Sequence, residues 1–124
     1  MDKRTKINRP ISATEVEVIR VTLERAAAAP EFKKLETNAE RLQVVGKCDC
    51  GCESVDFVEQ GTVPHVKPIA DGIGSTSRGG KVGVIVWGTP EIITGLEIYD
   101  LGAGDKDIKL PAPESIAPFE KGSP

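Results

Sequence analysis

All three cysteines of this chain stand at alternate positions, Cys48, Cys50 and Cys52, and its one histidine, His65, follows 13 residues after the last of them. Thiolate sulfur and imidazole nitrogen are usual zinc ligands, so these side chains could form a Cys3His site. Structural zinc sites, however, usually leave about two to four residues between paired cysteines, and this spacing leaves a single residue. Alternate residues of a strand share a face, so Cys48 and Cys50 could instead pack as small apolar groups. We expect no cofactor, with zinc as the alternative.

A cysteine nucleophile would need more than these residues. Catalysis by a thiol requires a hydrogen-bonded base and a third group that orients the base. His65 lies between Pro64 and Val66 in a segment typical of a loop, and no pattern brings it to a cysteine. We therefore predict that the protein is not an enzyme.

A glycine-rich segment, residues 71–81, has part of the composition of a phosphate-binding loop. Such loops follow a strand, precede a helix and place Ser or Thr directly after the lysine. Here Val82 follows Lys81 and belongs to a predicted strand, so the phosphate-loop interpretation fails. Arg78, which follows three hydroxyl residues, remains a candidate contact residue.

The N-terminal part of the chain predicts an arm followed by two helices. Residues 1–11 are mostly polar and are expected to form a flexible arm. Ser12 and Glu15 match the S-x-x-E capping box, and apolar residues follow at helical spacing as far as a run of alanines. Pro30 ends this helix or opens the next one, and residues 31–40 predict a shorter second helix.

From Leu42 onward the apolar residues alternate, which is typical of strands. The cysteine segment predicts a β-hairpin that reverses at residues 49–53. Residues 60–80 hold two prolines and five glycines, which indicates a long connection with a short edge strand near residues 66–69. Two further strands, joined by a turn that contains Gly and Pro, are predicted at residues 81–87 and 92–101.

These elements predict a single domain, residues 1–124, of the α+β class. Two amphipathic N-terminal helices must bury their apolar sides, so they are expected to pack on one face of an antiparallel sheet of about four strands. Residues 102–124 contain four prolines and are expected to cross the surface as an extended tail.

The net charge of −3 is unevenly distributed along the chain. The first ten residues carry four basic side chains and one aspartate, so the remainder carries −6. Nucleic acid binding needs a basic surface, which argues against a nucleic acid partner. The acidic charge suits a cationic partner, and it is also an ordinary charge for solubility. No apolar stretch approaches the length of a membrane span, and the basic start lacks the apolar segment of a secretory signal. We expect a cytoplasmic protein that does not associate with membranes.

The strand pattern also predicts a candidate binding surface. If the valines of residues 81–87 face the helices, then the side chains between them face away, on an open side of the sheet. That side would gather aromatic residues within a rim of carboxylates, which is typical of protein interfaces. The predicted surface consists of Asp56, Ile85, Trp87, Glu97 and Tyr99. In the alternative interpretation Trp87 closes the edge of the core or is covered by the proline-rich tail.

Four segments carry a resemblance to a known family, and they lie at residues 44–55, 68–72, 82–87 and 95–99. The first holds the C-x-C-G-C-x-S-V pattern and the last reads G-L-E-I-Y. Together they resemble a family of small uncharacterised bacterial proteins over roughly residues 12–119. The resemblance implies no activity and no site residue. By size and acidic charge alone, the chain is also similar to the immunity proteins of bacterial toxin systems.

The sequence therefore favours a non-enzymatic, intracellular bacterial binding protein with a protein partner. An immunity-type inhibitor that acts through the open sheet face, or through the loop at Arg78, is the specific form we expect. The alternative is a small domain stabilised by zinc at Cys48, Cys50, Cys52 and His65.

Overall fold

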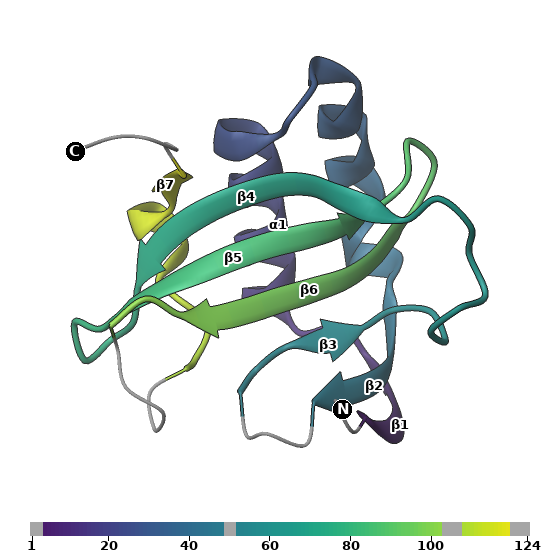
Figure 1. Ribbon diagram of the computed structural model, residues 1–124, viewed down its shortest axis with the longest axis horizontal. Coiled ribbons are helices and arrows are strands. Elements are labelled where there is room, and N and C mark those ends of the chain that lie inside the picture. Colours follow the sequence, from purple (N-terminus) through teal and green to yellow (C-terminus); the bar gives the residue numbers. More distant parts are fainter. Residues whose placement is uncertain (1–3, 49–51, 103–107, 120–124) are drawn as a thin grey trace.

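A computed structural model describes residues 4–48, 52–102 and 108–119. Within these residues, seven antiparallel strands form one sheet in the order β1-β2-β3-β6-β5-β4-β7, with the helices behind it (Figure 1). The elements in chain order are β1 (Arg4–Pro10), α1 (Ala13–Ala26), η1 (Pro30–Arg41), β2 (Gln43–Cys48), β3 (Val55–Asp56), β4 (Lys67–Ser75), β5 (Lys81–Gly88), β6 (Ile93–Asp100), η3 (Pro113–Ser115) and β7 (Ala117–Pro118). The α+β class and the antiparallel sheet are confirmed.

The sheet is wider than the predicted four strands because both ends of the chain join it. Residues 1–11 were predicted to be a flexible arm, but Arg4–Pro10 forms β1 and pairs with β2. Arg9 fixes this strand to the first helix, because its guanidinium donates to both carboxylate oxygens of Glu15 at 2.9 and 2.8 Å. At the other edge, the tail adds β7 alongside β4.

Helix α1 begins at the predicted capping box. The backbone N–H of Glu15 donates to the Ser12 hydroxyl at 3.1 Å, and the Glu15 carboxylate accepts from the Ser12 N–H at 2.9 Å. The helix buries Ile19 and Leu23 completely, each with a relative exposure of 0%. Burying one such side chain is worth about 1.5–3 kcal/mol, so this apolar side is what holds α1 against the sheet.

The second predicted helix exists but differs in type and in contacts. Pro30–Arg41 is a 3-10 helix that buries Phe32, Leu35 and Ala39. It packs mainly against α1, whereas α1 itself contacts β4 and β5. The prediction that two helices lie directly on the sheet is therefore only partly correct. In the described part of the chain, no helix combines the length and apolar character that crossing a bilayer requires.

The predicted hairpin and the two later strands are confirmed. β2 and β3 pair antiparallel, although most of the predicted reversal at residues 49–53 lies outside the described residues. β5 pairs with β6 almost along its whole length. The short strand predicted near residues 66–69 is wrong in extent, because β4 runs from Lys67 to Ser75 and pairs with β5 throughout. A register shift follows Pro68, which lets the strand accommodate a residue that cannot donate a ladder hydrogen bond.

The glycines that predicted a loop are contact points for the C-terminal tail. A Cβ atom on Gly74 would lie 2.6 Å from Cβ of Pro111, and one on Gly72 would lie 3.1 Å from Cγ2 of Ile116. Ile116 is buried beside α1, and Arg25 of that helix donates to its carbonyl oxygen at 2.9 Å. The described tail residues thus fill the helix side of β4 and its outer edge.

Candidate binding surface and pocket

The register of the sheet brings the five predicted surface residues to one face. Trp87 pairs with Gly95, Gly95 pairs with Asp56, and directly opposed residues share a face. Ile85 pairs with Glu97, and Tyr99 lies two residues further along the same strand. The alternating valines Val82, Val84 and Val86 are fully buried on the helix side. We call the side with Asp56, Ile85, Trp87, Glu97 and Tyr99 the open face.

Hydrogen bonds fix both aromatic rings of the open face. The Trp87 indole N–H donates to Oε1 of Glu97 at 2.9 Å, between diagonal neighbours of adjacent strands. The Tyr99 ring lies over Gly83, where an added Cβ would come within 2.0 Å of its Cζ atom. The Tyr99 hydroxyl reaches Oδ1 of Asp71 at 3.5 Å, across the intervening strand. Burial, and then the charges of Asp71 and Glu97, raise the pKa of Tyr99.

Arg78 is not brought to this face. It lies exposed in the turn between β4 and β5, where the Thr76 N–H donates to the Gly80 carbonyl at 2.8 Å. Trp87 stands near the other end of β5, which pairs with the first residues of β4. The two candidates of the sequence analysis, the open face and the Arg78 loop, are therefore separate surfaces.

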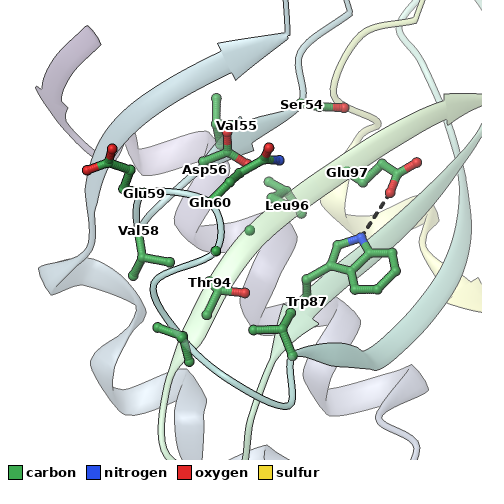
Figure 2. A pocket seen from close by; sticks show the side chains of 14 residues that line it. Ser54, Val55, Asp56, Val58, Glu59, Gln60, Trp87, Thr94, Leu96 and Glu97 are labelled. Atoms are coloured by element: carbon green, nitrogen blue, oxygen red, sulfur yellow. Dashed lines mark hydrogen bonds between the residues drawn. The ribbon is translucent and has the colours of Figure 1, made fainter. Parts of the chain in front are cut away.

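A pocket of about 520 Å³ lies on the open face, between Trp87 and the loop that joins β3 to β4. Figure 2 shows the indole on one side of the pocket, with the loop residues Val58, Glu59 and Gln60 across from it. The remaining lining residues come from β3 and the residue before it, from the rest of the loop and from within β6: Ser54, Val55, Asp56, Gly61, Val63, Val66, Thr94, Gly95, Leu96 and Glu97.

The charged groups that line this pocket are all acidic. They are Asp56, Glu59 and Glu97, and the described lining includes no Lys, Arg or His. Glu59 also contacts Lys6, whose Nζ lies 3.8 Å from Oε1 of Glu59. That lysine lines a second hollow, of about 410 Å³, on the far side of the Glu59 segment.

Glycines make room for the Asp56 carboxylate, which lines the pocket. A Cβ on Gly46 would lie 3.0 Å from Oδ2 of Asp56, and a Cβ on Gly95 would lie 3.8 Å from Oδ1. The Asp56 carboxylate thus occupies the space between two positions without side chains. An isolated glycine inside a strand signals a close approach of other groups, so Gly95 was a detectable sign of this pocket.

The zinc ligand set is not assembled by the described residues. Cys48 ends β2 and Cys52 precedes β3; both are half-buried, and the Cys52 thiol donates to the Ser54 hydroxyl at 3.3 Å. Cys50 lies outside the described residues. His65 is exposed, with a positive φ of 63°, just before β4 pairs with the end of β5. Ser54 binds Ile98 near the opposite end of the sheet, so β3 separates His65 from the two cysteines. Among the described residues, no group of three potential ligands could hold a metal.

Sequence reasoning missed the loop residues that close the pocket and also missed Asp71. The loop valines Val58, Val63 and Val66 carried no periodic signal, since their positions depend on the path of an irregular segment. Asp71 was assigned to a glycine-rich connection, and it joins the open face because that segment is a strand.

Comparisons with protein-family models, with curated proteins and with solved structures found no match for this chain. The resemblance to a family of small bacterial proteins therefore stays a prediction.

Proposed function

We propose that this chain is a non-enzymatic, intracellular bacterial binding protein that recognises a protein partner through its open face. The observation that carries the proposal is the pocket beside Trp87, on the side of the sheet away from α1 and the described tail. Aromatic side chains surrounded by polar groups are enriched where protein interfaces concentrate their binding energy.

Apolar side chains that are exposed or half-buried on the open face support a macromolecular partner. Val66 at the rim is 38% exposed, which is high for a large apolar side chain in this chain. Ile73 and Ile85 remain half-buried on the same face without a covering element among the described residues. A partner that covers these side chains would remove apolar area from water at about 25 cal/mol per Å².

The acidic character of the face defines the kind of partner. Asp56, Glu59, Asp71 and Glu97 lie on or beside the open face, and the chain beyond its first ten residues is acidic. Complementary charge speeds encounter and selects partners, so we expect a partner with a basic surface. An immunity-type inhibitor, which would neutralise a basic toxin, is the specific form that the small size and this charge favour.

A binding measurement with matched variants tests the proposal. The probe is the purified product of the adjacent gene, titrated by calorimetry into the wild type, Ile85→Lys and Thr37→Lys. Ile85 pairs with Glu97 and Asp71 on the open face, whereas Thr37 is exposed on η1, and both changes add one positive charge. We expect Ile85→Lys to weaken binding at least about tenfold, since a lysine there opposes a basic partner, and Thr37→Lys to leave it unchanged.

The same variants test the immunity form. If the adjacent product is toxic, co-expression of the wild type or Thr37→Lys should restore growth, and Ile85→Lys should not. A partner whose affinity is the same for all three proteins would show that the open face is not the binding surface.

A further inference from the structure

We propose that the pocket beside Trp87 receives an arginine side chain of the partner protein. The inference rests on the proposed function and specifies the chemistry of its central contact. The pocket combines an indole wall, carboxylates around it and apolar side chains at its rim. This combination fits a flat cation with an aliphatic stem.

The Trp87 indole and Glu97 form one side of the proposed arginine-binding pocket. Their hydrogen bond of 2.9 Å holds the Trp87 ring in one orientation, so a ring face is presented without further ordering. A carboxylate has about four lone-pair sites, and the indole N–H occupies one of those on Glu97. A guanidinium stacked on the indole could therefore also donate to Glu97, since arginine stacks on aromatic faces and pairs with carboxylates through a planar fork.

The opposite wall of the pocket supplies two further carboxylates. Asp56 and Glu59 lie across from Trp87 (Figure 2), so a cation between the walls meets negative charge on both sides. The part of the lining that the structure describes contains no Lys, Arg or His. Lys6 contacts Glu59 from the other hollow. Both side chains of this ion pair are exposed, so the pair contributes little free energy, and a desolvated guanidinium would displace Lys6 from Glu59.

The size of the pocket favours a side chain delivered by a peptide over a free small cation. A volume of about 520 Å³ exceeds what one guanidinium fills and lies in the usual range for ligand pockets. Val58, Val63 and Val66 line the remaining space, where they would contact the methylene stem and the adjoining residue of the partner. An arginine followed or preceded by an apolar residue uses both parts of the pocket.

Gly95 provides a way to fill the pocket without disturbing the fold. A Cβ at this position would lie 3.6 Å from the Val55 carbonyl oxygen and 3.8 Å from Cβ of Trp87, which are ordinary contacts. Gly95→Ala should therefore fold normally, while Gly95→Val extends two methyl groups into the space above the sheet. Glu97→Gln removes the charge and keeps an oxygen acceptor for the indole N–H.

The experiment uses the fluorescence of Trp87, because the chain contains one tryptophan and the signal reports this pocket alone. The full chain is titrated with N-acetyl-arginine amide, with the neutral isostere N-acetyl-citrulline amide and with N-acetyl-lysine amide. We expect saturable binding of the arginine compound in the millimolar range, and at least about tenfold weaker binding of citrulline. Glu97→Gln and Gly95→Val should each weaken arginine binding about tenfold or more, and Glu24→Gln, an exposed change on α1, should not.

Three results would overturn the inference: no saturable response up to about 50 mM arginine compound, equal binding of arginine and citrulline, or tighter binding of lysine than arginine. The partner measurement separates this failure from failure of the proposed function. If Ile85→Lys abolishes partner binding while Gly95→Val and Glu97→Gln leave it intact, the open face binds the partner and the arginine receptor is wrong. If Gly95→Val fails to fold, as judged by circular dichroism, Glu97→Gln and the comparison of arginine with citrulline still decide the outcome.

Discussion

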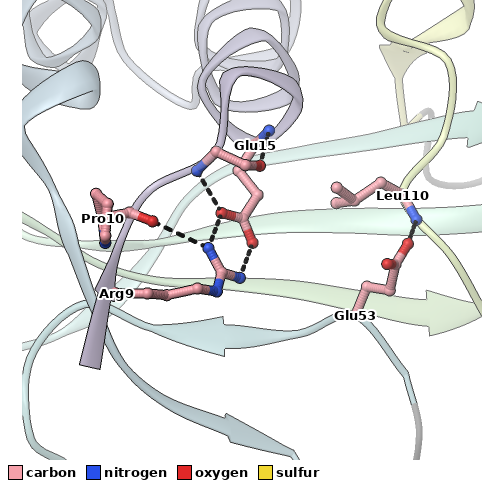
Figure 3. Close-up of polar contacts among 6 residues, drawn as sticks. Arg9, Pro10, Glu15, Glu53 and Leu110 are labelled. Carbon is pink, nitrogen blue, oxygen red and sulfur yellow. Dashed lines mark hydrogen bonds and ion pairs between the residues drawn. The ribbon is translucent and has the colours of Figure 1, made fainter. Parts of the chain in front are cut away.

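The ion pair between Arg9 and Glu15 should determine whether β1 stays attached to the domain. Figure 3 shows the Arg9 guanidinium in a bidentate contact with the Glu15 carboxylate at the start of α1. The Glu15 side chain is 4% exposed and that of Arg9 is 42% exposed. The substitution Arg9→Met keeps the aliphatic stem and removes the guanidinium, which leaves the buried carboxylate with the Ser12 N–H as its remaining hydrogen-bond donor.

The magnitude follows from these exposures. Breaking a fully buried ion pair by removing one partner costs about 3–5 kcal/mol, and a hydrogen bond to a charged group is worth about 1.5–3 kcal/mol. Because water reaches the Arg9 side of this pair, we expect Arg9→Met to lower the free energy of unfolding by about 2 kcal/mol. For a domain of this length that corresponds to a fall in Tm of roughly 8 °C.

The pH dependence has a defined sign. Burial alone would raise the pKa of Glu15, but hydrogen bonds from Arg9 and Ser12 and the charge of Arg9 outweigh it and hold the pKa below its ordinary value of 4.5. A lowered folded pKa contributes stability that is present above pH 4.5 and is lost as the pH falls through the folded pKa. The difference in free energy of unfolding between the wild type and Glu15→Gln should therefore be largest at neutral pH and should decrease as the pH falls below 4.5.

A double-mutant cycle checks this reasoning. Urea unfolding of the wild type, Arg9→Met, Glu15→Gln and the double variant should give a coupling energy of about 1–1.5 kcal/mol at pH 7, because the two residues contact each other directly. Additive effects within about 0.5 kcal/mol, unchanged between pH 7 and pH 3, would refute the claim that this pair fixes the N-terminal strand.

Three further outcomes test other parts of the structure. Ser54→Ala should destabilise the domain by about 2–4 kcal/mol in urea unfolding, because the Ser54 hydroxyl binds both the N–H and the carbonyl of buried Ile98. A loss of stability below about 0.5 kcal/mol would contradict this bridging role. Gly83→Ala should cost about 1–3 kcal/mol and change the near-UV circular dichroism, because its methyl group would displace the Tyr99 ring. The control Gly95→Ala should stay within about 0.5 kcal/mol of the wild type, and equal effects of the two alanines would contradict the ring placement. Protein purified without chelator should carry less than about half a zinc per chain by elemental analysis, with unchanged stability in EDTA; one zinc per chain would restore the metal interpretation.

The elements that the sequence predicted well are those in which local pattern and tertiary burial agree. Helix α1 has a capping box and an apolar side, and the strands at β5 and β6 have apolar residues at the positions that the helices cover. The same alternation placed Trp87 and Tyr99 together on the face away from the helices, since register in a sheet follows directly from which residues are buried.

The elements that the sequence did not predict form only because a distant segment completes them. β1 has a polar sequence and is held by pairing with β2 and by the contact of Arg9 with Glu15. β4 contains a proline and two glycines, and its glycines accept the tail residues Pro111 and Ile116. The pocket depends on the path of the β3–β4 loop, which no local periodicity encodes.

The shortness of β3 has a consequence for how the domain folds and opens. Residues 55 and 56 join the sheet formed by the first half of the chain to the β4–β5–β6 meander, through the pairs of Val55 with Leu96 and Asp56 with Gly95. The meander consists of consecutive hairpins that can close early, whereas the junction at β3 must wait for a long loop to close. The pocket spans this junction, so an occupant would bind only the closed form and slow its opening. Hydrogen exchange at the Leu96 amide should then report occupancy of the pocket as a change in local unfolding.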